Sequence, residues 1–122
     1  MSIEPLLTIQ NNEQLSQLLQ EQKTSILYFS SPDCNVCHAL LPKVLKVAQV
    51  YKIPVGQINT QEFKEGAGQL LVFTVPTLLV MCEGREILRE SRFIDLQNTA
   101  RILESVTEEM QVPSSIISLS NI

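Results

Sequence analysis

Apolar residues alternate along the first half of the chain between patterns typical of strands and of helices. SILYFS, residues 25–30, is almost continuously apolar with β-branched and aromatic members, as expected of a strand buried on both faces. From Asn35 onward the apolar residues recur with helical period, at Val36, Leu40, Leu41, Val44, Leu45 and Ala48. Pro42 lies inside this pattern and predicts a kinked helix, because proline removes one amide donor.

Further elements flank this strand and helix. Strands are predicted at 6–9 and 53–59, a helix in NNEQLSQLLQEQ (11–22), and a short helix at 61–72. Asn11 or Asn12 is the expected N-cap of the first helix, and Gly66 and Gly68 weaken the later one. The order strand, helix, strand, helix predicts parallel strands joined by crossovers.

The second half of the chain predicts an antiparallel hairpin and a last helix. TLLVMC (77–82) and REILRESR (85–92) are predicted to be two strands joined by the turn at Glu83-Gly84. Asp95 is the expected N-cap of a helix over 96–110, whose apolar face comprises Leu96, Ala100, Leu103 and Met110. Pro113 ends this helix, and the Ser- and Ile-rich tail after it has no assigned structure.

Composition narrows the class of protein. A chain of 122 residues with 44% hydrophobic content suits one compact domain, expected over 1–111 with a tail at 112–122. The formal net charge of -4 argues against nucleic acid and against an anionic membrane as partners. No signal-like segment or membrane helix is apparent, so a cytoplasmic location is expected. With three cysteines, any disulfide in such a compartment would be transient.

The candidate chemistry lies in the stretch YFSSPDCNVCHALLPKV, residues 28–44. Cys34 and Cys37 stand three apart in a first helical turn, where Cβ atoms are about 5–6 Å apart, close enough for a disulfide. The unpaired amides of a helix N-terminus favour a thiolate, which predicts Cys34 as the attacking sulfur and Cys37 as the resolving one. Two electrons would then pass through a mixed disulfide on Cys34.

The strand, SPDCNVC, the helix with Pro42, and VPT before a hairpin together resemble the thioredoxin family over roughly residues 6–110. The resemblance implies an α/β, thioredoxin-like fold: a mixed central sheet, helices on both faces, and a C-terminal β-hairpin plus helix. It implies that Pro76 is cis, opposite the cysteine pair, and that an extended substrate pairs with the backbone at Val75. The implied partners are disulfide-bearing protein substrates and a thioredoxin-reductase-type or low-molecular-weight thiol donor, with no bound cofactor.

Several positions depart from the family pattern. Between the cysteines, Asn35-Val36 replaces the usual Gly-Pro. Tyr28 stands where the family has a buried acid on the central strand, and Gln57 stands where that acid has its lysine partner. Ser30 and Asp33 replace the tryptophans that flank the motif, and the glycine that lines the substrate groove aligns approximately with Arg92. Arg92 and Val75 with Pro76 are the candidate substrate-binding residues. The departures leave a second hypothesis open, a redox-inactive or weakly active binding or adaptor protein with a thioredoxin fold.

Three further residues have competing interpretations. His38 could lend positive charge to Cys34, or could be a solvated helix residue. Tyr28 is expected to be a core residue with its hydroxyl satisfied, because its phenol keeps its proton at pH 7. Cys82 is expected to act as a small hydrophobe rather than as a regulatory thiol. A metal site from Cys34, Cys37, His38 and Cys82 is not predicted, because zinc ligands usually come as two spaced pairs.

Overall fold

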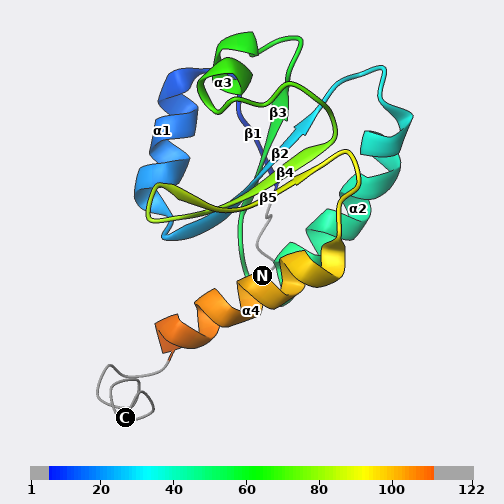
Figure 1. The fold of residues 1–122 in the computed structure, drawn as a ribbon. Coiled ribbons are helices and arrows are strands. Elements are labelled where there is room, and N and C mark those ends of the chain that lie inside the picture. Colours follow the sequence, from blue (N-terminus) through cyan, green and yellow to red (C-terminus); the bar gives the residue numbers. More distant parts are fainter. Residues whose placement is uncertain (1–5, 112–122) are drawn as a thin grey trace.

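The structure is a computed structural model that describes residues 6–111, with side chains as far as Thr107. Its elements are β1 (Leu6–Thr8), α1 (Asn12–Glu21), β2 (Thr24–Ser30), α2 (Asn35–Val50), β3 (Val55–Asn59), α3 (Lys64–Gln69), β4 (Thr77–Cys82), β5 (Arg85–Ser91) and α4 (Leu96–Gln111) (Figure 1). The tail predicted at 112–122, the first five residues and the side chain of Met110 lie outside the described part.

One mixed sheet forms the centre of the domain, in the strand order β1-β3-β2-β4-β5. β3 runs parallel to both β1 and β2, as the predicted crossovers require. β4 is antiparallel to β2 and forms a hairpin with β5, which confirms the predicted hairpin. All seven residues of β2 are buried, because this strand has a neighbour on each side and helices over both faces.

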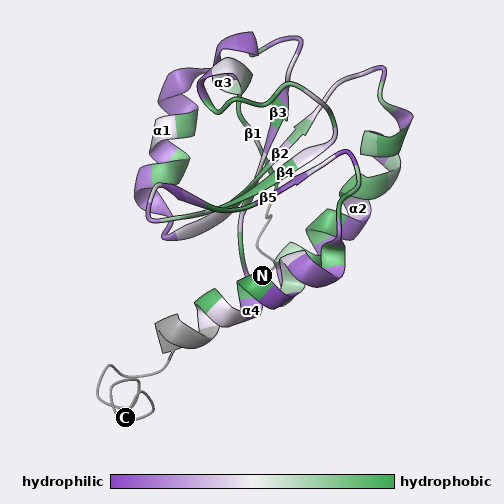
Figure 2. Cartoon of the chain, viewed as in Figure 1, coloured by the Kyte–Doolittle hydropathy of each residue, from purple (hydrophilic) through white to green (hydrophobic). Residues whose placement is uncertain are grey.

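Helices cover the two faces of the sheet (Figures 1 and 2). Two clusters of buried apolar side chains form the core, one on each face. Alternate residues of β2 point to opposite faces, as the pleat requires. Leu27 and Phe29 pack in the cluster beneath α1 and α3, whereas Ile26 and Tyr28 pack in the cluster beneath α2 and α4. The strand that leads into the cysteine loop is therefore packed against both apolar clusters.

The helix ends agree with the predicted caps. The Asn11 side chain accepts a hydrogen bond from the Gln14 amide at 2.8 Å, and the Asp95 carboxylate accepts one from the Asn98 amide at 3.1 Å.

α3 is shorter than the predicted 61–72 helix. Before it, the Asn59 side chain accepts hydrogen bonds from the Gln61 and Glu62 amides, in a turn that delays the helix. After it, Leu71 adopts a φ of 58°, a left-handed conformation through which a right-handed helix cannot continue.

Two glycines of α3 offer a matched pair of stability tests. A methyl group at Gly66 would lie 2.4 Å from the ring of the buried Phe63, whereas nothing lies within 4 Å of one at Gly68. Gly66→Ala should therefore destabilise the fold by about 1–3 kcal/mol through overpacking. Gly68→Ala should be neutral or stabilise by up to about 1 kcal/mol, through helix propensity. Urea unfolding of both variants would check this, and an equal loss in both would contradict the packing around Phe63.

Candidate active site

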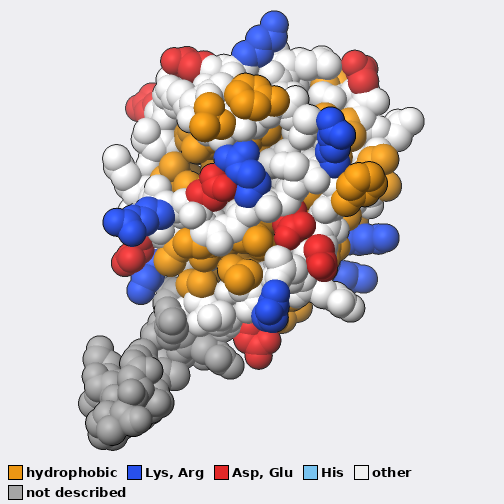
Figure 3. Space-filling model, viewed as in Figure 1, with side chains coloured by type: hydrophobic (Ala, Val, Ile, Leu, Met, Phe, Trp, Pro, Cys, Tyr) orange, Lys and Arg blue, Asp and Glu red, His pale blue; other side chains and the backbone are white. Residues whose placement is uncertain are grey.

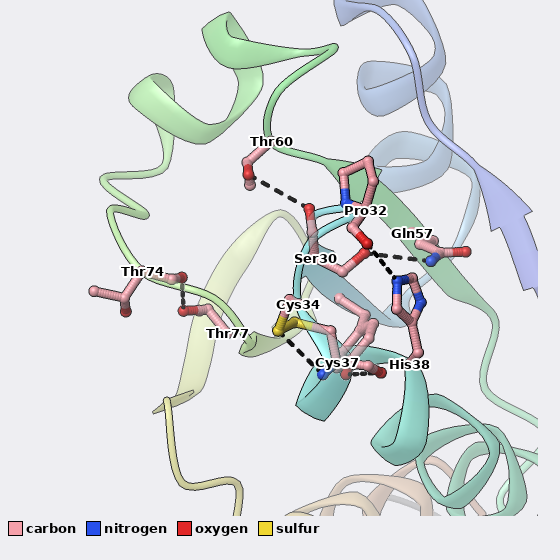
Figure 4. The surroundings of a disulfide bond; sticks show 10 residues. Ser30, Pro32, Cys34, Cys37, His38, Gln57, Thr60, Thr74 and Thr77 are labelled. Atoms are coloured by element: carbon pink, nitrogen blue, oxygen red, sulfur yellow. Dashed lines mark hydrogen bonds between the residues drawn. A yellow bond between two sulfur atoms is a disulfide. The ribbon is translucent and has the colours of Figure 1, made fainter.

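Cys34 and Cys37 lie where β2 passes into α2, and they form a disulfide with a Cα–Cα distance of 5.2 Å (Figure 4). β2 ends at Ser30, and the chain turns through residues 31–33, with the Cys34 amide donating to the Ser31 carbonyl at 3.1 Å. Cys34 has extended backbone angles and is the N-cap of α2, while Cys37 is in the first turn. The predicted bridging of the pair is therefore present.

The two sulfurs differ in exposure and in their polar contacts. Cys37 is only 1% exposed, whereas Cys34 is partly exposed. The Cys37 amide donates a hydrogen bond to the Cys34 sulfur at 3.1 Å, in the place where a serine or aspartate cap would accept it. A reagent from solution can reach Cys34, and the same amide is placed to stabilise negative charge on that sulfur.

The Val75–Pro76 segment lies beside the cysteine loop. Thr77, the first residue of β4, pairs with Phe29 near the end of β2, which places the preceding two residues next to the point where the cysteine loop leaves the sheet. The Val75–Pro76 peptide bond is cis. Among the described residues, none makes a hydrogen bond to the backbone N–H or C=O of Val75.

Arg92 joins this segment through its backbone. The Arg92 amide donates to the Pro76 carbonyl at 2.7 Å, so the residue after β5 is bonded to the residue before β4. Arg92 has a φ of 67°, a conformation that favours glycine, which agrees with the family glycine that the sequence placed near this position. The structure thus brings together Val75, Pro76 and Arg92, the three residues predicted to bind substrate.

Two exposed aromatic residues flank this segment and were not singled out from the sequence. Phe73 is 80% exposed and Phe93 is 87% exposed, and Val36, between the cysteines, is also exposed. Phe73 and Val75 line an open hollow of about 360 Å³ together with Thr60 and Lys64. The sequence signal was present, because each phenylalanine sits in a predicted loop within three residues of a candidate site residue.

Tyr28 lies beneath the cysteine pair and is fully buried. Its hydroxyl donates to the Cys37 carbonyl at 2.7 Å, which confirms the expected core residue with a satisfied hydroxyl. Burial raises the pKa of Tyr28 to about 12. The phenol therefore keeps its proton at neutral pH and is not a base for Cys37.

The remaining predicted residues lie around the cysteine loop, and Figure 4 shows His38, Ser30 and Gln57 among them. The His38 imidazole Nε2 lies 3.1 Å from the Pro32 carbonyl, and in Figure 4 the ring points to that carbonyl rather than to the disulfide. Gln61 donates to the Asp33 carboxylate at 3.3 Å, and Gln57 donates to the Ser30 hydroxyl at 3.3 Å. Asn35 is exposed, next to Val36, on the outer side of the first turn of α2.

Cys82 lies at the opposite end of the sheet. It pairs with Thr24 at the start of β2, six residues before the end from which the cysteine loop departs, or roughly 20 Å along the strand. No cluster of three or more metal-ligating side chains occurs among residues 6–107, and Cys82 is too far away to join Cys34, Cys37 and His38. Within the described residues, no helix has the length and hydropathy needed to cross a membrane.

This geometry is matched by known proteins. The family model described as Thioredoxin matches residues 6–108. The chain belongs to the thioredoxin family. This membership and the strand order confirm the predicted family and the predicted α/β fold class.

Three relatives illustrate the extent of the likeness. Thioredoxin-like protein YdfQ of Bacillus subtilis (strain 168) is 39% identical over 93 residues, which cover 75% of this chain and 83% of that protein. Thioredoxin 1 from Thermosipho africanus TCF52B is 32% identical with a TM-score of 0.67, covering 72% and 99% of the two chains. A mutant thioredoxin from Halobacterium salinarum NRC-1 superposes with a TM-score of 0.79 over 88% and 96%, at 23% identity, and shows the fold alone.

The raised pKa of Tyr28 predicts a loss of stability at alkaline pH. Its folded-state pKa is about 12, above the value near 10 expected for an unfolded chain. Folding favours the neutral phenol, so this stabilisation is complete below about pH 10 and is lost as pH rises towards 12, by about 2–3 kcal/mol in all. Urea unfolding of the oxidised protein between pH 9 and 12 should show a steeper loss for wild type than for Tyr28→Phe. Equal slopes would contradict the burial of the phenol.

Proposed function

We propose that this chain is a thiol–disulfide oxidoreductase that reduces protein disulfides through the Cys34/Cys37 dithiol. The observation that carries the proposal is the pairing of an accessible sulfur at the N-cap of α2 with a buried sulfur one turn later. Membership of the thioredoxin family supports the same chemistry.

The proposed cycle needs only thiolates and disulfides. The Cys34 thiolate attacks one sulfur of the substrate disulfide, forming a mixed disulfide and releasing the first substrate thiolate. Cys37 then loses its proton and attacks the Cys34 sulfur, which forms the internal disulfide and releases the second substrate thiolate. Two electrons pass to the substrate, and an external thiol donor returns the protein to its dithiol form.

The assignment of roles follows from access and from charge. A substrate disulfide can reach Cys34 from solution, whereas Cys37 is covered in the oxidised protein. The Cys37 amide, which donates to the Cys34 sulfur, would also stabilise the Cys34 thiolate in the reduced protein. Cys34 is therefore the nucleophile of the proposal and Cys37 the resolving thiol.

The surface around the disulfide favours polypeptide substrates. The backbone groups of Val75, to which no described residue makes a hydrogen bond, suit an added strand of substrate, since an extended peptide gains main-chain hydrogen bonds at such a position. Phe73 and Phe93 offer apolar contact on the segments that flank it, and Arg92 adds a cation at the rim. Asp33, Asn35, Val36 and His38 form the environment of the two sulfurs in this proposal.

The proposed compartment is the cytoplasm, where thiol pools keep a pair of this kind cycling between dithiol and disulfide. The electron donor of the proposal is either a thioredoxin-reductase-type protein or a low-molecular-weight thiol. The cycle as written uses no bound cofactor, because all the electrons move between sulfur atoms.

The first functional prediction separates the two sulfurs. Cys34→Ser should abolish insulin disulfide reduction, because no nucleophile then reaches the substrate. Cys37→Ser should trap a mixed disulfide on Cys34, which non-reducing electrophoresis and mass spectrometry would detect.

Two controls accompany this experiment. Cys82→Ser should leave turnover within a few-fold of wild type, because its sulfur is at the far end of the sheet. Trapping through Cys37 in the Cys34→Ser variant would reverse the assigned roles. A wild-type protein that reduces no disulfide at any potential would favour the alternative of a binding or adaptor protein.

The second functional prediction concerns the missing buried base. A carboxylate near a resolving thiol can take its proton, a contribution on the order of a hundredfold or more, whereas the Tyr28 phenol cannot do so near pH 7. The mixed disulfide on Cys34 should therefore accumulate during wild-type turnover. Tyr28→Asp should speed its resolution, at a stability cost of several kcal/mol for the buried charge.

Acid-quench kinetics would measure the intermediate, with Tyr28→Phe as the matched control. That variant removes the hydroxyl without adding a base, so it should resolve at close to the wild-type rate. If wild type shows no build-up and a folded Tyr28→Asp variant shows no gain, another group or water already serves Cys37.

A further inference from the structure

Arg89, on the outer strand β5, reaches across to the end of α3. Its guanidinium donates to the Leu70 carbonyl at 2.7 Å and to the Leu71 carbonyl at 3.0 Å. These carbonyls close the C-terminal end of α3, where unpaired oxygens carry partial negative charge. The Arg89 side chain thus joins β5 to the end of α3, through hydrogen bonds to residues that lie 18 and 19 positions earlier in the sequence.

Glu86 holds this guanidinium in place. Its two carboxylate oxygens accept from Nε and from the Nη2 nitrogen of Arg89, each at 2.8 Å, and Nη2 also serves the Leu70 carbonyl. This fork geometry belongs to arginine, because a planar guanidinium directs several donors at fixed angles. The contact with Arg89 also lowers the pKa of Glu86, as expected for a carboxylate that accepts from a cation.

The Leu70 and Leu71 carbonyls that Arg89 binds lie at the start of the loop between α3 and β4. Val72 is buried in the core immediately after them, and Phe73, Thr74 and Val75 follow. The Thr77 hydroxyl donates to the Thr74 carbonyl at 2.7 Å and holds the other end of this loop. Of the described side chains, only Arg89 bonds the beginning of the loop to the hairpin. The face in Figure 3 shows basic and acidic groups in contact near its middle, with hydrophobic groups on either side.

We propose that the Glu86–Arg89 pair positions the loop between α3 and β4 for protein substrates, by holding the Leu70 and Leu71 carbonyls against β5. The pair touches neither sulfur, so it governs the binding of a polypeptide at Phe73 and Val75 rather than thiol exchange at Cys34. This inference rests on the proposed reductase function. Arg89 is a positioning residue, and its loss should affect large substrates selectively.

Arg89→Gln is the main test, since glutamine keeps a polar side chain but lacks the charged fork. The KM for insulin should rise by several-fold up to about tenfold. The kcat with hydroxyethyl disulfide, a small neutral substrate, should stay within about twofold of wild type, and the potential of the Cys34/Cys37 couple should be unchanged. Arg85→Gln is the matched control, because Arg85 is exposed on the same strand and makes no bond to the loop.

A charge swap separates the carbonyl contacts from the ion pair. Glu86→Arg combined with Arg89→Glu restores opposite charges but leaves no donor at position 89 for the Leu70 and Leu71 carbonyls. The KM defect should therefore persist in the swap, and should be smaller in Arg89→Lys than in Arg89→Gln. Full recovery of KM in the swap would show that only the ion pair matters and would overturn the inference.

Two results keep this inference distinct from the reductase proposal. Backbone amide chemical shifts of Thr74 and Val75 should move in Arg89→Gln and not in Arg85→Gln, whether or not the protein reduces insulin. Unmoved shifts would overturn the positioning role by themselves. An equal loss of kcat/KM with insulin and with hydroxyethyl disulfide would also overturn it, whereas a wild type inactive on both substrates would refute the reductase function alone.

Discussion

The hydrogen bond from the Cys37 amide to the Cys34 sulfur connects the fold to its chemistry. The first amides of a helix need hydrogen-bond acceptors from outside the helix. In α2 the Cys34 sulfur is such an acceptor, 3.1 Å from the Cys37 amide nitrogen. The same contact sets one sulfur at the surface and places the other one turn along, where the core covers it. Position at a helix end thus gives two identical side chains different access and different charge stabilisation.

That arrangement depends on a strand that is packed on both faces. β2 is buried along its whole length between two apolar clusters, and the cysteine loop starts directly from its end. Tyr28 links the strand to the first turn of α2, because its hydroxyl donates to the Cys37 carbonyl from inside the core. A carboxylate at this place would carry a charge, whereas the phenol adds a hydrogen bond and apolar volume without one. The site is therefore built for a well-held pair of sulfurs, with no internal base supplied by this residue.

The surface next to the cysteine loop is assembled from segments distant in the sequence. The Arg92 amide closes onto the Pro76 carbonyl, and Arg89 ties the end of α3 to the same hairpin strand. Arg89 lies on β5, the edge strand, and Arg92 follows the last residue of that strand, so the hairpin holds the chain on both sides of Val75. Exposed Phe73 and Phe93 lie on or next to segments that these contacts hold, as the proposed binding of polypeptides requires.

The sequence alone determined most of the elements and the cysteine pair, because hydrophobic period, caps at Asn11 and Asp95, and C-x-x-C spacing are local signals. That the strands form one mixed sheet was implied by the likeness to thioredoxin. The sequence also placed Pro76, Val75 and Arg92 in one site through the likeness to thioredoxin. It predicted α3 too long, since the turn made by Asn59 and the left-handed Leu71 depend on the packed loop. Only the tertiary structure decided that His38 faces the Pro32 carbonyl, that Tyr28 meets the Cys37 carbonyl, and that Arg89 clamps α3. These contacts join residues whose separation in space is set by sheet order and helix packing, and a linear pattern carries no record of such distances.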